Sequence, residues 1–388
     1  MRKTIYDIIT HPAPPGRLRR YLPQLLLLAL ALSSLGLLRL ICTRRGWADW
    51  LIAHVTTPLK QVAGRLFGLL PFSAAEVLWT AGVLALLIFL LRSLWVIGLG
   101  VAHRLQGRPA HPLRSLLRRA LALLAAGLLV YAGYTFTWGV NYYGATFSER
   151  SGLEGRATTD EELFQLTAAF AVRCSELAGQ VERNGDGQFC EGDLFARSEG
   201  LYSSLYDEFP FLERAEVRAK PMFYSRLMSA LGFTGFYFPF TGESMVNVDA
   251  PAVLVPATIL HELAHQKNVA LEDECNFLAI VAGLKSDDIA FQYSSALMGY
   301  IHLGNALYSA DTSLWREAYA LLGEQARADL MENNAYWAQF DSPVEEAVEA
   351  AATNIYSGFA QSFGQEDVMH SYGACVDLLA AYYLPEEG

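Results

Sequence analysis

The stretch "ATILHELAHQKNVALEDECNFLA", residues 257–279, places two histidines four residues apart with a glutamate directly after the first. On a helix, His261 and His265 lie one turn apart on the same face. Two imidazoles so placed can hold one zinc ion, and Glu262 beside them can take a proton from a water on that ion. The stretch therefore predicts a metal-dependent hydrolytic centre on a helix. The alternative is an amphipathic helix whose His and Glu side chains face solvent.

A catalytic zinc site needs a third protein ligand and an open fourth position. The segment "LEDECNFLA", residues 271–279, offers Glu272, Asp273 and Glu274. If this segment is a helix, Glu272 and Asn276 share a face. We then expect Glu272 to be the third zinc ligand and Asn276 to brace a ligand by a hydrogen bond. Glu274 points about 160° away from Glu272 by helix geometry, and we place it among the residues that support the ligands.

The first third of the chain is basic and apolar, whereas the rest is acidic. The chain has 388 residues, of which 53% are hydrophobic. Residues 1–139 hold 16 of the 29 Lys and Arg and only three acids, a net charge of +13, and residues 140–388 carry a net −24. Such an asymmetry indicates two environments. The acidic part can bury a core of its own and lacks the basic surface that nucleic-acid binding requires.

Three segments are long and apolar enough to cross a bilayer, which takes about 20 residues as a helix. They lie at about residues 20–41, 75–98 and 117–139. The alternative, a set of buried core helices, is disfavoured because so short a chain segment leaves little protein to cover them. A basic stretch precedes the first run and no small-residue cleavage pattern follows it, so we expect a retained helix and not a signal peptide.

The short-loop Lys and Arg predict the orientation. Residues 1–20 carry five of them, and five arginines lie between the second and third spans, at residues 104–119. Both regions should be cytoplasmic, which places residues 141–388 outside. The loop between the first two spans contains "WADWLIAHVTTPLKQVAGRLFGLL", residues 47–70, with apolar residues at near-helical spacing. We expect it to lie along the outer membrane surface.

Residues 141–388 read as mostly helical. The segment "TTDEELFQLTAAFAVRCSELAGQVE" at 158–182 begins with a Thr cap followed by acids, and segments 294–310, 313–340 and 342–363 have the same periodicity. The exception is residues 232–251, rich in Gly, Pro and aromatic residues, which predict a short strand or hairpin. His302 lies on an apolar helical face and is expected in the core.

Two other local patterns carry weaker predictions. Residues 182–193, "ERNGDGQFCEGD", resemble a Ca²⁺-binding loop, although Glu and Asp stand at the first and twelfth places where Asp and Glu are usual. A solvated Asn-Gly-Asp-Gly turn is the alternative. Of the cysteines, Cys174 and Cys190 are the candidate disulfide of an exported domain. The alternative is that the domain's four cysteines are buried small hydrophobes, as we expect for Cys275.

The motifs also carry a resemblance. The 257–279 stretch looks like the zincin metallopeptidases with a Glu ligand, whose second motif often reads Glu-x-x-Ala-Asp or Glu-x-x-Ala-Asn. The layout as a whole resembles a bacterial family of polytopic membrane proteins known as domain of unknown function 3810. This resemblance rests on "GFYFPFTGESMVN", the 257–279 stretch, "FQYSSAL" and "HSYGACVDLLAAYY". It implies a membrane zinc-peptidase-like protein.

The chain departs from this pattern at two places. Gln266-Lys267-Asn268 stands where the family favours Gln-Arg-Gly, and Cys275 stands where Ala is usual. Asn268 can adopt the left-handed conformation that Gly would take at a helix end. Neither change removes a ligand or the base, so we expect activity.

The resemblance implies further roles. The stretch "ESMVNVD", residues 243–249, is expected to be a strand edge that pairs with an extended substrate; otherwise Glu243 and Asn247 support the site. An oxyanion stabiliser is also required. Tyr293, Tyr372 and His370 lie in or beside family motifs and are the candidates, and each of them could equally pack or brace.

The expected molecule is a membrane protein with three N-terminal transmembrane helices in residues 1–140, followed by a mainly α zincin-like extracytoplasmic domain with a small β element in residues 141–388. It would be multi-pass in the bacterial cytoplasmic membrane and hydrolyse membrane-adjacent peptides or proteins with Zn²⁺. One alternative is a non-catalytic receptor or scaffold with a structural or vestigial zinc site. The other is a zinc hydrolase of cell-wall peptide amides.

Overall fold

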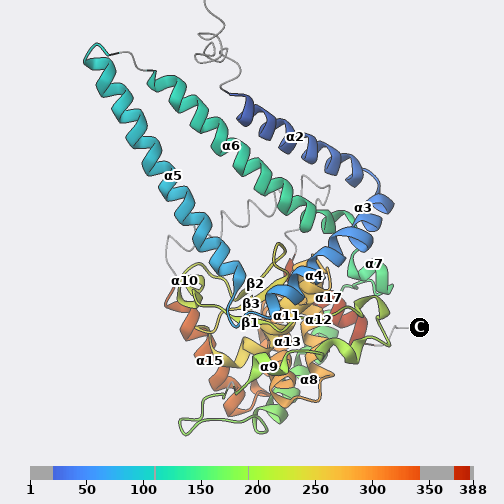
Figure 1. The fold of residues 1–388 in the computed structure, drawn as a ribbon. Coiled ribbons are helices and arrows are strands. Elements are labelled where there is room, and N and C mark those ends of the chain that lie inside the picture. Colours follow the sequence, from blue (N-terminus) through green and yellow to red (C-terminus); the bar gives the residue numbers. More distant parts are fainter. Residues whose placement is uncertain (1–20, 109–110, 191, 341–370, 385–388) are drawn as a thin grey trace, which may run out of the picture. The chain divides into compact units, whose positions relative to one another are not determined.

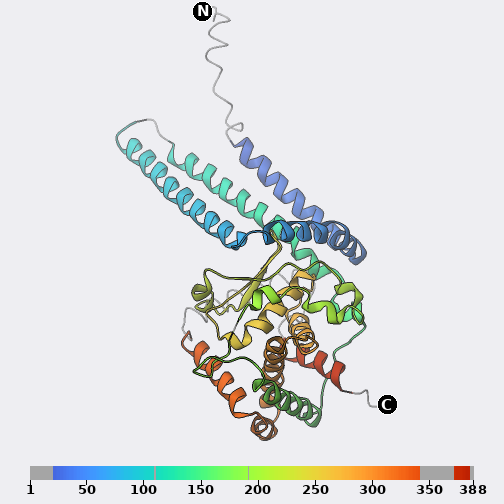
Figure 2. The same ribbon diagram turned by 60° about the horizontal axis from the view of Figure 1, so that its bottom comes forward.

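The computed structural model describes residues 21–108, 111–190, 192–340 and 371–384. In this part of the chain the fold is mainly helical, with one small sheet (Figures 1 and 2). The α-helices are α2 (Leu22–Cys42), α3 (Arg45–Leu51), α4 (Thr57–Gly68), α5 (Ala74–Leu105), α6 (Pro112–Thr137), α7 (Phe147–Ser151), α8 (Asp160–Ala178), α9 (Leu194–Arg197), α10 (Ser225–Ser229), α11 (Val255–Gln266), α12 (Glu272–Leu284), α13 (Ile289–Ala310), α14 (Thr312–Ala320), α15 (Glu324–Ala338) and α17 (Ser371–Tyr383).

The prediction of three long apolar helices is confirmed. Helices α2, α5 and α6 are each long and apolar enough to cross a membrane. Their side chains are mostly exposed, as lipid-facing helices require. Helices α2 and α6 run side by side (Figures 1 and 2). Helix α5 has 32 residues, several more than a span needs.

The chain forms two compact units, and their composition differs in one segment from the expected boundary at residue 140. One unit contains residues 1–44 and 79–140, and the other contains residues 45–78 and 141–388. The segment between the first two spans therefore belongs to the same unit as the histidine motif. The reason is a set of buried polar contacts made by Lys60, Glu76 and the backbone of Ala74, which the sequence pattern does not reveal.

The predicted hairpin at residues 232–251 is confirmed. Strands β2 (Gly235–Phe238) and β3 (Glu243–Val246) pair antiparallel, with Gly235 opposite Val246 and Phe238 opposite Glu243. The short strand β1 (Lys220–Pro221) pairs parallel with the other side of β3. Helix α11 packs on this sheet, followed in space by α12 and α13 (Figure 1). Their apolar residues, with those of α8, form one continuous core.

The expectation of a substrate-pairing edge at residues 243–249 is wrong. Strand β3 is the central strand, because β1 and β2 occupy both of its edges. The Asn247 amide also donates inside the protein, to the Ser229 hydroxyl and the Phe233 carbonyl. In the sheet order β1-β3-β2, strand β2 lies at an edge beside α11.

Other local predictions have mixed outcomes. Thr159 caps α8 in a capping box with Glu162, as its Thr-x-x-Glu sequence predicts. The disulfide is not formed, and Cys174 and Cys190 are both free thiols. The loop after α8 forms the alternative turn, in which the Asn184 side-chain oxygen accepts the backbone N–H groups of Asp186 and Gln188. Calcium binding there stays a prediction, and segment 342–363 lies outside the described residues.

Glu243 fastens β3 to the beginning of α5. Its carboxylate accepts the backbone N–H groups of Ala74 and Ala75 at 3.1 and 2.9 Å, which have no partner within the helix. Lys220 pairs with the same carboxylate at 2.7 Å and also donates to the carbonyls of Phe67 and Phe72. A carboxylate at a helix N-terminus is also favoured by the helix dipole.

Lys267, directly after α11, forms a fully buried ion pair with Glu216 at 2.7 Å. Its ammonium group also donates to the Tyr206 hydroxyl and the Arg214 carbonyl, at 2.8 Å each. All three donors of this cation therefore have partners, as a buried charge requires. The pair holds the segment around residue 216 against the end of the histidine helix.

We expect Lys267→Met to destabilise the protein by about 3–5 kcal/mol, because it leaves the Glu216 carboxylate buried without its partner. Thermal unfolding in detergent measures the effect. Arg218→Gln is the control, since Arg218 pairs with Glu199 with both side chains more than half exposed, and such pairs contribute at most about 1 kcal/mol. Equal midpoints for the two variants would contradict the importance of the buried pair.

Candidate metal centre

A tight turn between α11 and α12 folds the two halves of the motif together. Helix α11 ends at Gln266, and Asn268 adopts a left-handed φ of 65°, the only positive φ at a non-glycine residue in the described part of the chain. Asn tolerates this conformation better than most residues. The chain then reverses into α12, which begins at Glu272. The expectation for Asn268 is confirmed.

The two histidines are oriented by hydrogen bonds from their Nδ1 atoms. His261 Nδ1 bonds with the Asn276 side-chain oxygen at 2.8 Å, and His265 Nδ1 bonds with the Val269 carbonyl at 2.9 Å. The Nε2 atoms lie near one carboxylate oxygen of Glu272, at 3.0 Å from His261 and 3.7 Å from His265. Outer hydrogen bonds to one nitrogen fix which nitrogen of a histidine is free to bind a metal. The structure thus brings His261, His265, Glu272 and Asn276 together.

Glu262 lies beside these residues and is buried. Its side chain is 3% exposed, and its Oε2 atom is buried without a hydrogen-bond partner. Burial raises the pKa of Glu262 to about 7, although the charges of His261 and His265 oppose the shift. A buried carboxylate oxygen normally has a partner. This one fits a water or a polar substrate group next to the histidines.

Strand β2 approaches Glu262 closely at Gly235. A Cβ atom at Gly235 would lie 2.6 Å from Glu262 Oε1 and 2.9 Å from its Cγ. Only glycine therefore allows the edge strand and the Glu262 carboxylate to keep their positions. In the sequence, Gly235 is visible only as the first residue of the "GFYFPF" motif. The motif does not show that this residue contacts Glu262.

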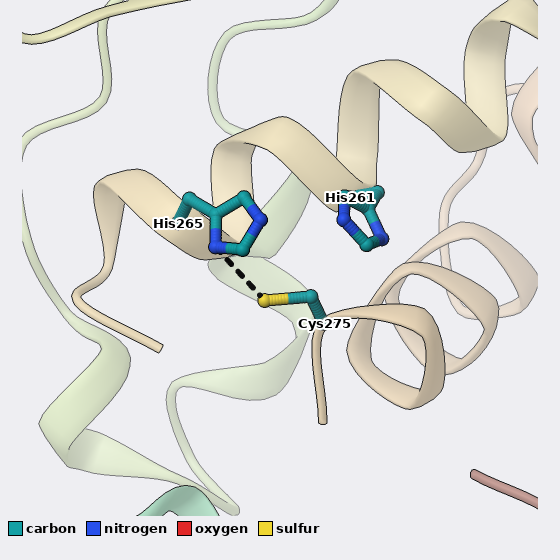
Figure 3. A group of neighbouring side chains, drawn as sticks. All are labelled: His261, His265 and Cys275. Atoms are coloured by element: carbon teal, nitrogen blue, oxygen red, sulfur yellow. Dashed lines mark hydrogen bonds between the residues drawn. The ribbon is translucent and has the colours of Figure 1, made fainter. Parts of the chain in front are cut away.

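Cys275 is an alternative to Glu272 as the third metal ligand. His261, His265 and Cys275 each offer an atom within 4.8 Å of the others (Figure 3). However, the Cys275 sulfur lies 3.3 Å from His265 Nδ1, on the side of the ring that faces the Val269 carbonyl. Burial raises the pKa of the Cys275 thiol to about 12, whereas a metal ligand must be a thiolate. Glu272, which is 50% exposed and faces both Nε2 atoms, fits an open catalytic site better.

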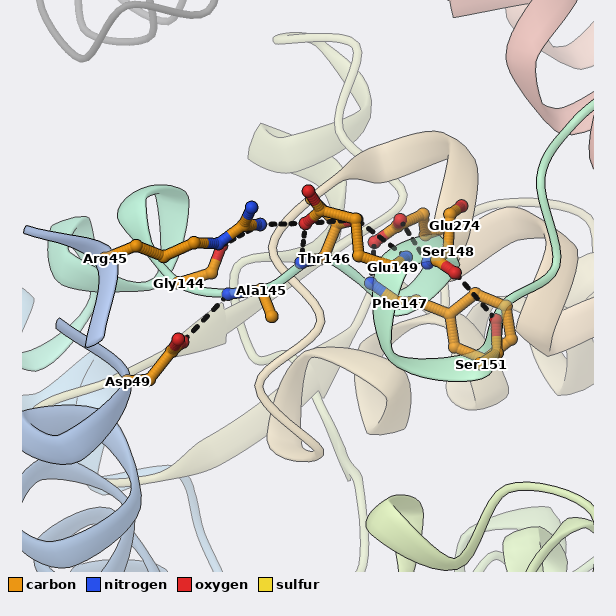
Figure 4. A network of polar contacts seen from close by, with 10 residues as sticks. All are labelled: Arg45, Asp49, Gly144, Ala145, Thr146, Phe147, Ser148, Glu149, Ser151 and Glu274. Atoms are coloured by element: carbon orange, nitrogen blue, oxygen red, sulfur yellow. Dashed lines mark hydrogen bonds and ion pairs between the residues drawn. The ribbon is translucent and has the colours of Figure 1, made fainter.

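Glu274 does not support the ligands as expected. Its carboxylate accepts the backbone N–H groups of Phe147 and Ser148 at 2.9 and 3.0 Å, at the beginning of α7 (Figure 4). This is the consequence of its position nearly opposite Glu272 on α12. Glu274 therefore fastens the beginning of α7 to α12, the helix that begins at Glu272. The remaining acid of this segment, Asp273, interacts with the backbone of Cys375 in α17.

The structure does not bring Tyr293 to the histidines. It is buried on α13, and its hydroxyl donates to Asp329 at 2.5 Å. Asp329 in turn pairs with Arg183. Tyr293 therefore belongs to an ion-pair cluster with Asp329 and Arg183, and its expected oxyanion role stays a prediction. Tyr372 begins α17 but its side chain lies outside the described part, as does His370 altogether.

Two residues that sequence reasoning missed lie within electrostatic reach of the centre. Burial raises the pKa of Tyr237, on β2, and the charge of His265 opposes the shift. Burial lowers the pKa of His302, on α13, to about 4, and the charge of His261 adds to it. The Nδ1 atom of His302 is also buried without a hydrogen-bond partner. His302 was expected as an ordinary core residue.

The donor set fits zinc. Two imidazoles with their Nδ1 atoms hydrogen-bonded and one carboxylate are the kinds of ligand that zinc takes in catalytic sites. The carboxylate of Glu262 is the kind of group that can serve as a base in such a site. A structural zinc site would instead close four protein ligands around the ion.

No curated protein and no solved structure matches the chain. A family model does match, over residues 54–380, and its description is "Protein of unknown function (DUF3810)". The match covers most of the chain, including α4, α5, α6 and both helices of the histidine motif. The chain therefore belongs to the DUF3810 family.

Proposed function

We propose that this protein is a membrane-anchored zinc-dependent peptidase, with His261, His265 and Glu272 as ligands and Glu262 as general base. The observation that carries the proposal is the buried, unpartnered Oε2 atom of Glu262 beside two histidines whose Nε2 atoms both lie near Glu272. A receptor or scaffold needs only the ligands. An isolated buried carboxylate oxygen costs stability, which supports a catalytic use.

The residues divide the work as follows. Zinc, when bound, supplies a Lewis acid that activates water and polarises the substrate carbonyl. Glu262 accepts a proton from the attacking water and passes it to the leaving amine nitrogen. Asn276 and the Val269 carbonyl hold the two imidazoles in the orientation that frees Nε2. Tyr237 and His302 join Tyr293 as described side chains to test as oxyanion donors.

The substrate class follows from tethering. Three apolar helices lie in the same chain as the site, so we propose membrane-adjacent peptides or proteins as substrates. The Lys and Arg distribution supports a cytoplasmic N-terminus and a site outside the cytoplasmic membrane.

Measurement of the zinc content distinguishes the proposed ligand Glu272 from the proposed base Glu262. We expect the purified wild type to hold about one zinc ion per chain, as a single catalytic site does. Glu262→Gln should keep the zinc but lose roughly 10²–10⁴-fold in peptidase activity, because only the base is removed. Glu272→Ala should lose zinc in dialysis against a chelator, since a ligand is removed. Elemental analysis checks all three proteins, and a wild type without zinc after loading would sink the proposal.

Cys275→Ala distinguishes the two possible third ligands. We expect this variant to keep both zinc and activity, because the sulfur lies on the Nδ1 side of His265. The same elemental analysis, run beside Glu272→Ala, provides the comparison. Loss of zinc in Cys275→Ala with retention in Glu272→Ala would reverse the ligand assignment.

Gly235→Ala tests the contact between the edge strand and the base. The added methyl group meets Glu262 Oε1 at 2.6 Å, so the carboxylate must move. We expect full zinc content with activity reduced by roughly 10²-fold, the effect of a misplacement of about 1 Å. Gly185→Ala is the control, because nothing lies within 4 Å of a Cβ atom there. Unchanged activity in Gly235→Ala would mean that Glu262 is not held by this contact.

A further inference from the structure

We propose that the outward apolar face of α4, together with Phe223, is a docking surface for the lipid bilayer that holds the metal centre at the membrane surface. We call this surface the lipid-docking face and define it by Leu59, Val62, Leu66, Leu69 and Phe223. The contact with lipid is independent of catalysis, whereas the substrate class inferred from it below rests on the proposed function.

The chain itself brings α3 and α4 to the membrane. Only residues 43–44 separate α2 from α3, and only residues 69–73 separate α4 from α5. Five residues reach at most about 18 Å when extended. Helices α2 and α5 are both long and apolar enough to span. Both ends of the α3–α4 segment are therefore tied within a short distance of a bilayer.

Helix α4 has the two faces that an interfacial helix requires. Leu59, Val62, Leu66 and Leu69 follow one another at spacings of three, four and three residues, and all are exposed. The opposite face is buried, with Lys60 and Gly64 turned toward the protein. A Cβ atom at Gly64 would lie 3.0 Å from the Gly242 carbonyl, so this side is in close contact with the β2–β3 turn.

A second segment places an exposed aromatic side chain near the beginning of α5. Phe223 is 84% exposed. The backbone N–H groups of Phe223 and Tyr224 donate to the carboxylate of Glu76, at 3.0 and 2.9 Å. Glu76 lies in the first turn of α5. Phe223 is thus fastened to the beginning of a membrane helix, as aromatic residues at a bilayer interface often are.

The lipid-docking face is connected directly to the metal centre. Lys60, on the buried side of α4, donates to the Asn268 side chain at 2.5 Å, and Asn268 donates to Thr57 at 2.7 Å. Asn268 is the turn residue between the two metal helices. Two hydrogen bonds to Asn268 therefore link the helix that bears the face to the histidine motif.

Helix α3 makes a second connection to the histidine motif, through the segment before α7. Arg45 pairs with Glu149, and Asp49 accepts the backbone N–H of Ala145 at 2.9 Å (Figure 4). The same segment continues to Phe147, which donates to Glu274 on α12. The surface helices thus hold both the end of α11 and the beginning of α12.

These connections set the distance of the metal centre from the bilayer, provided that the face contacts lipid. Under the proposed function, the site would then act on the part of a membrane-anchored polypeptide that lies just outside the lipid, and free soluble peptides would be poor substrates. The segment of a membrane-anchored polypeptide that directly follows its membrane span lies at this distance from the lipid.

The contact is tested by fluorescence in lipid nanodiscs. An environment-sensitive label is attached to Val62→Cys or, as matched control, Met331→Cys, in a background with Cys42→Ser and Cys190→Ser. Val62 and Met331 are 64% and 65% exposed, and the remaining cysteines are buried. Quenchers are phosphatidylcholine carrying a doxyl group near the headgroup, and aqueous iodide. Circular dichroism and gel filtration verify that each variant is folded.

We expect the label at Val62 to be quenched by the doxyl lipid and to be several-fold less accessible to iodide than the label at Met331, which should show the reverse. Quenching at Val62 by iodide alone would overturn the proposal, because the face would be in water. Protection from both quenchers would also overturn it, because protein would cover the face. Neither readout needs zinc or activity, so failure here is distinct from failure of the proposed function.

The substrate class has its own readout. A peptide carrying an acyl anchor should be cleaved several-fold faster in nanodiscs than the same peptide without the anchor. Equal rates, with lipid contact at Val62 established, would overturn the substrate class and leave the lipid-docking face intact.

Discussion

The reversal of the chain at Asn268 is the constraint on which the rest of the site depends. A single left-handed residue ends α11 and allows α12 to return past it, so that Glu272 meets the Nε2 atoms of both histidines. The same residue uses its side chain to bind Lys60 and Thr57 in α4. Asn268 thus provides both the turn between α11 and α12 and the hydrogen bonds that join this turn to α4. A glycine would provide the conformation without these two hydrogen bonds.

The parts of the centre that follow from helical periodicity were predictable from the sequence. His261 and His265 are four residues apart, and so are Glu272 and Asn276, so each pair shares a face as soon as its segment is helical. Glu274, two positions after Glu272, leaves that face and caps α7, which only the fold could reveal. Tyr293 lies in a family motif, but a motif does not show which group its hydroxyl faces, and this hydroxyl donates to Asp329.

The contacts that sequence could not predict join segments far apart in the chain. Residues 45–78 are apolar and lie between two candidate spans, which favours a place in the membrane region, yet Lys60 and Glu76 are buried and bond with Asn268 and with the backbone of Phe223 and Tyr224 in the acidic part of the chain. Strand order is similarly hidden, because nothing in residues 243–249 shows that β1, more than twenty residues earlier, occupies one side of β3. Gly235 matters through its contact with Glu262, which lies 27 positions further along the chain.

The carboxylate of Glu243 has a mechanical consequence. It holds the first backbone N–H groups of α5, while Lys220 holds the carbonyls just before them. Sliding α5 along its axis would break these bonds inside the protein. A transmembrane helix normally adapts to bilayer thickness by small changes of depth and tilt. In α5, the end attached to β3 is fixed, so a thicker or thinner bilayer would strain the strand that lies under the histidine helix.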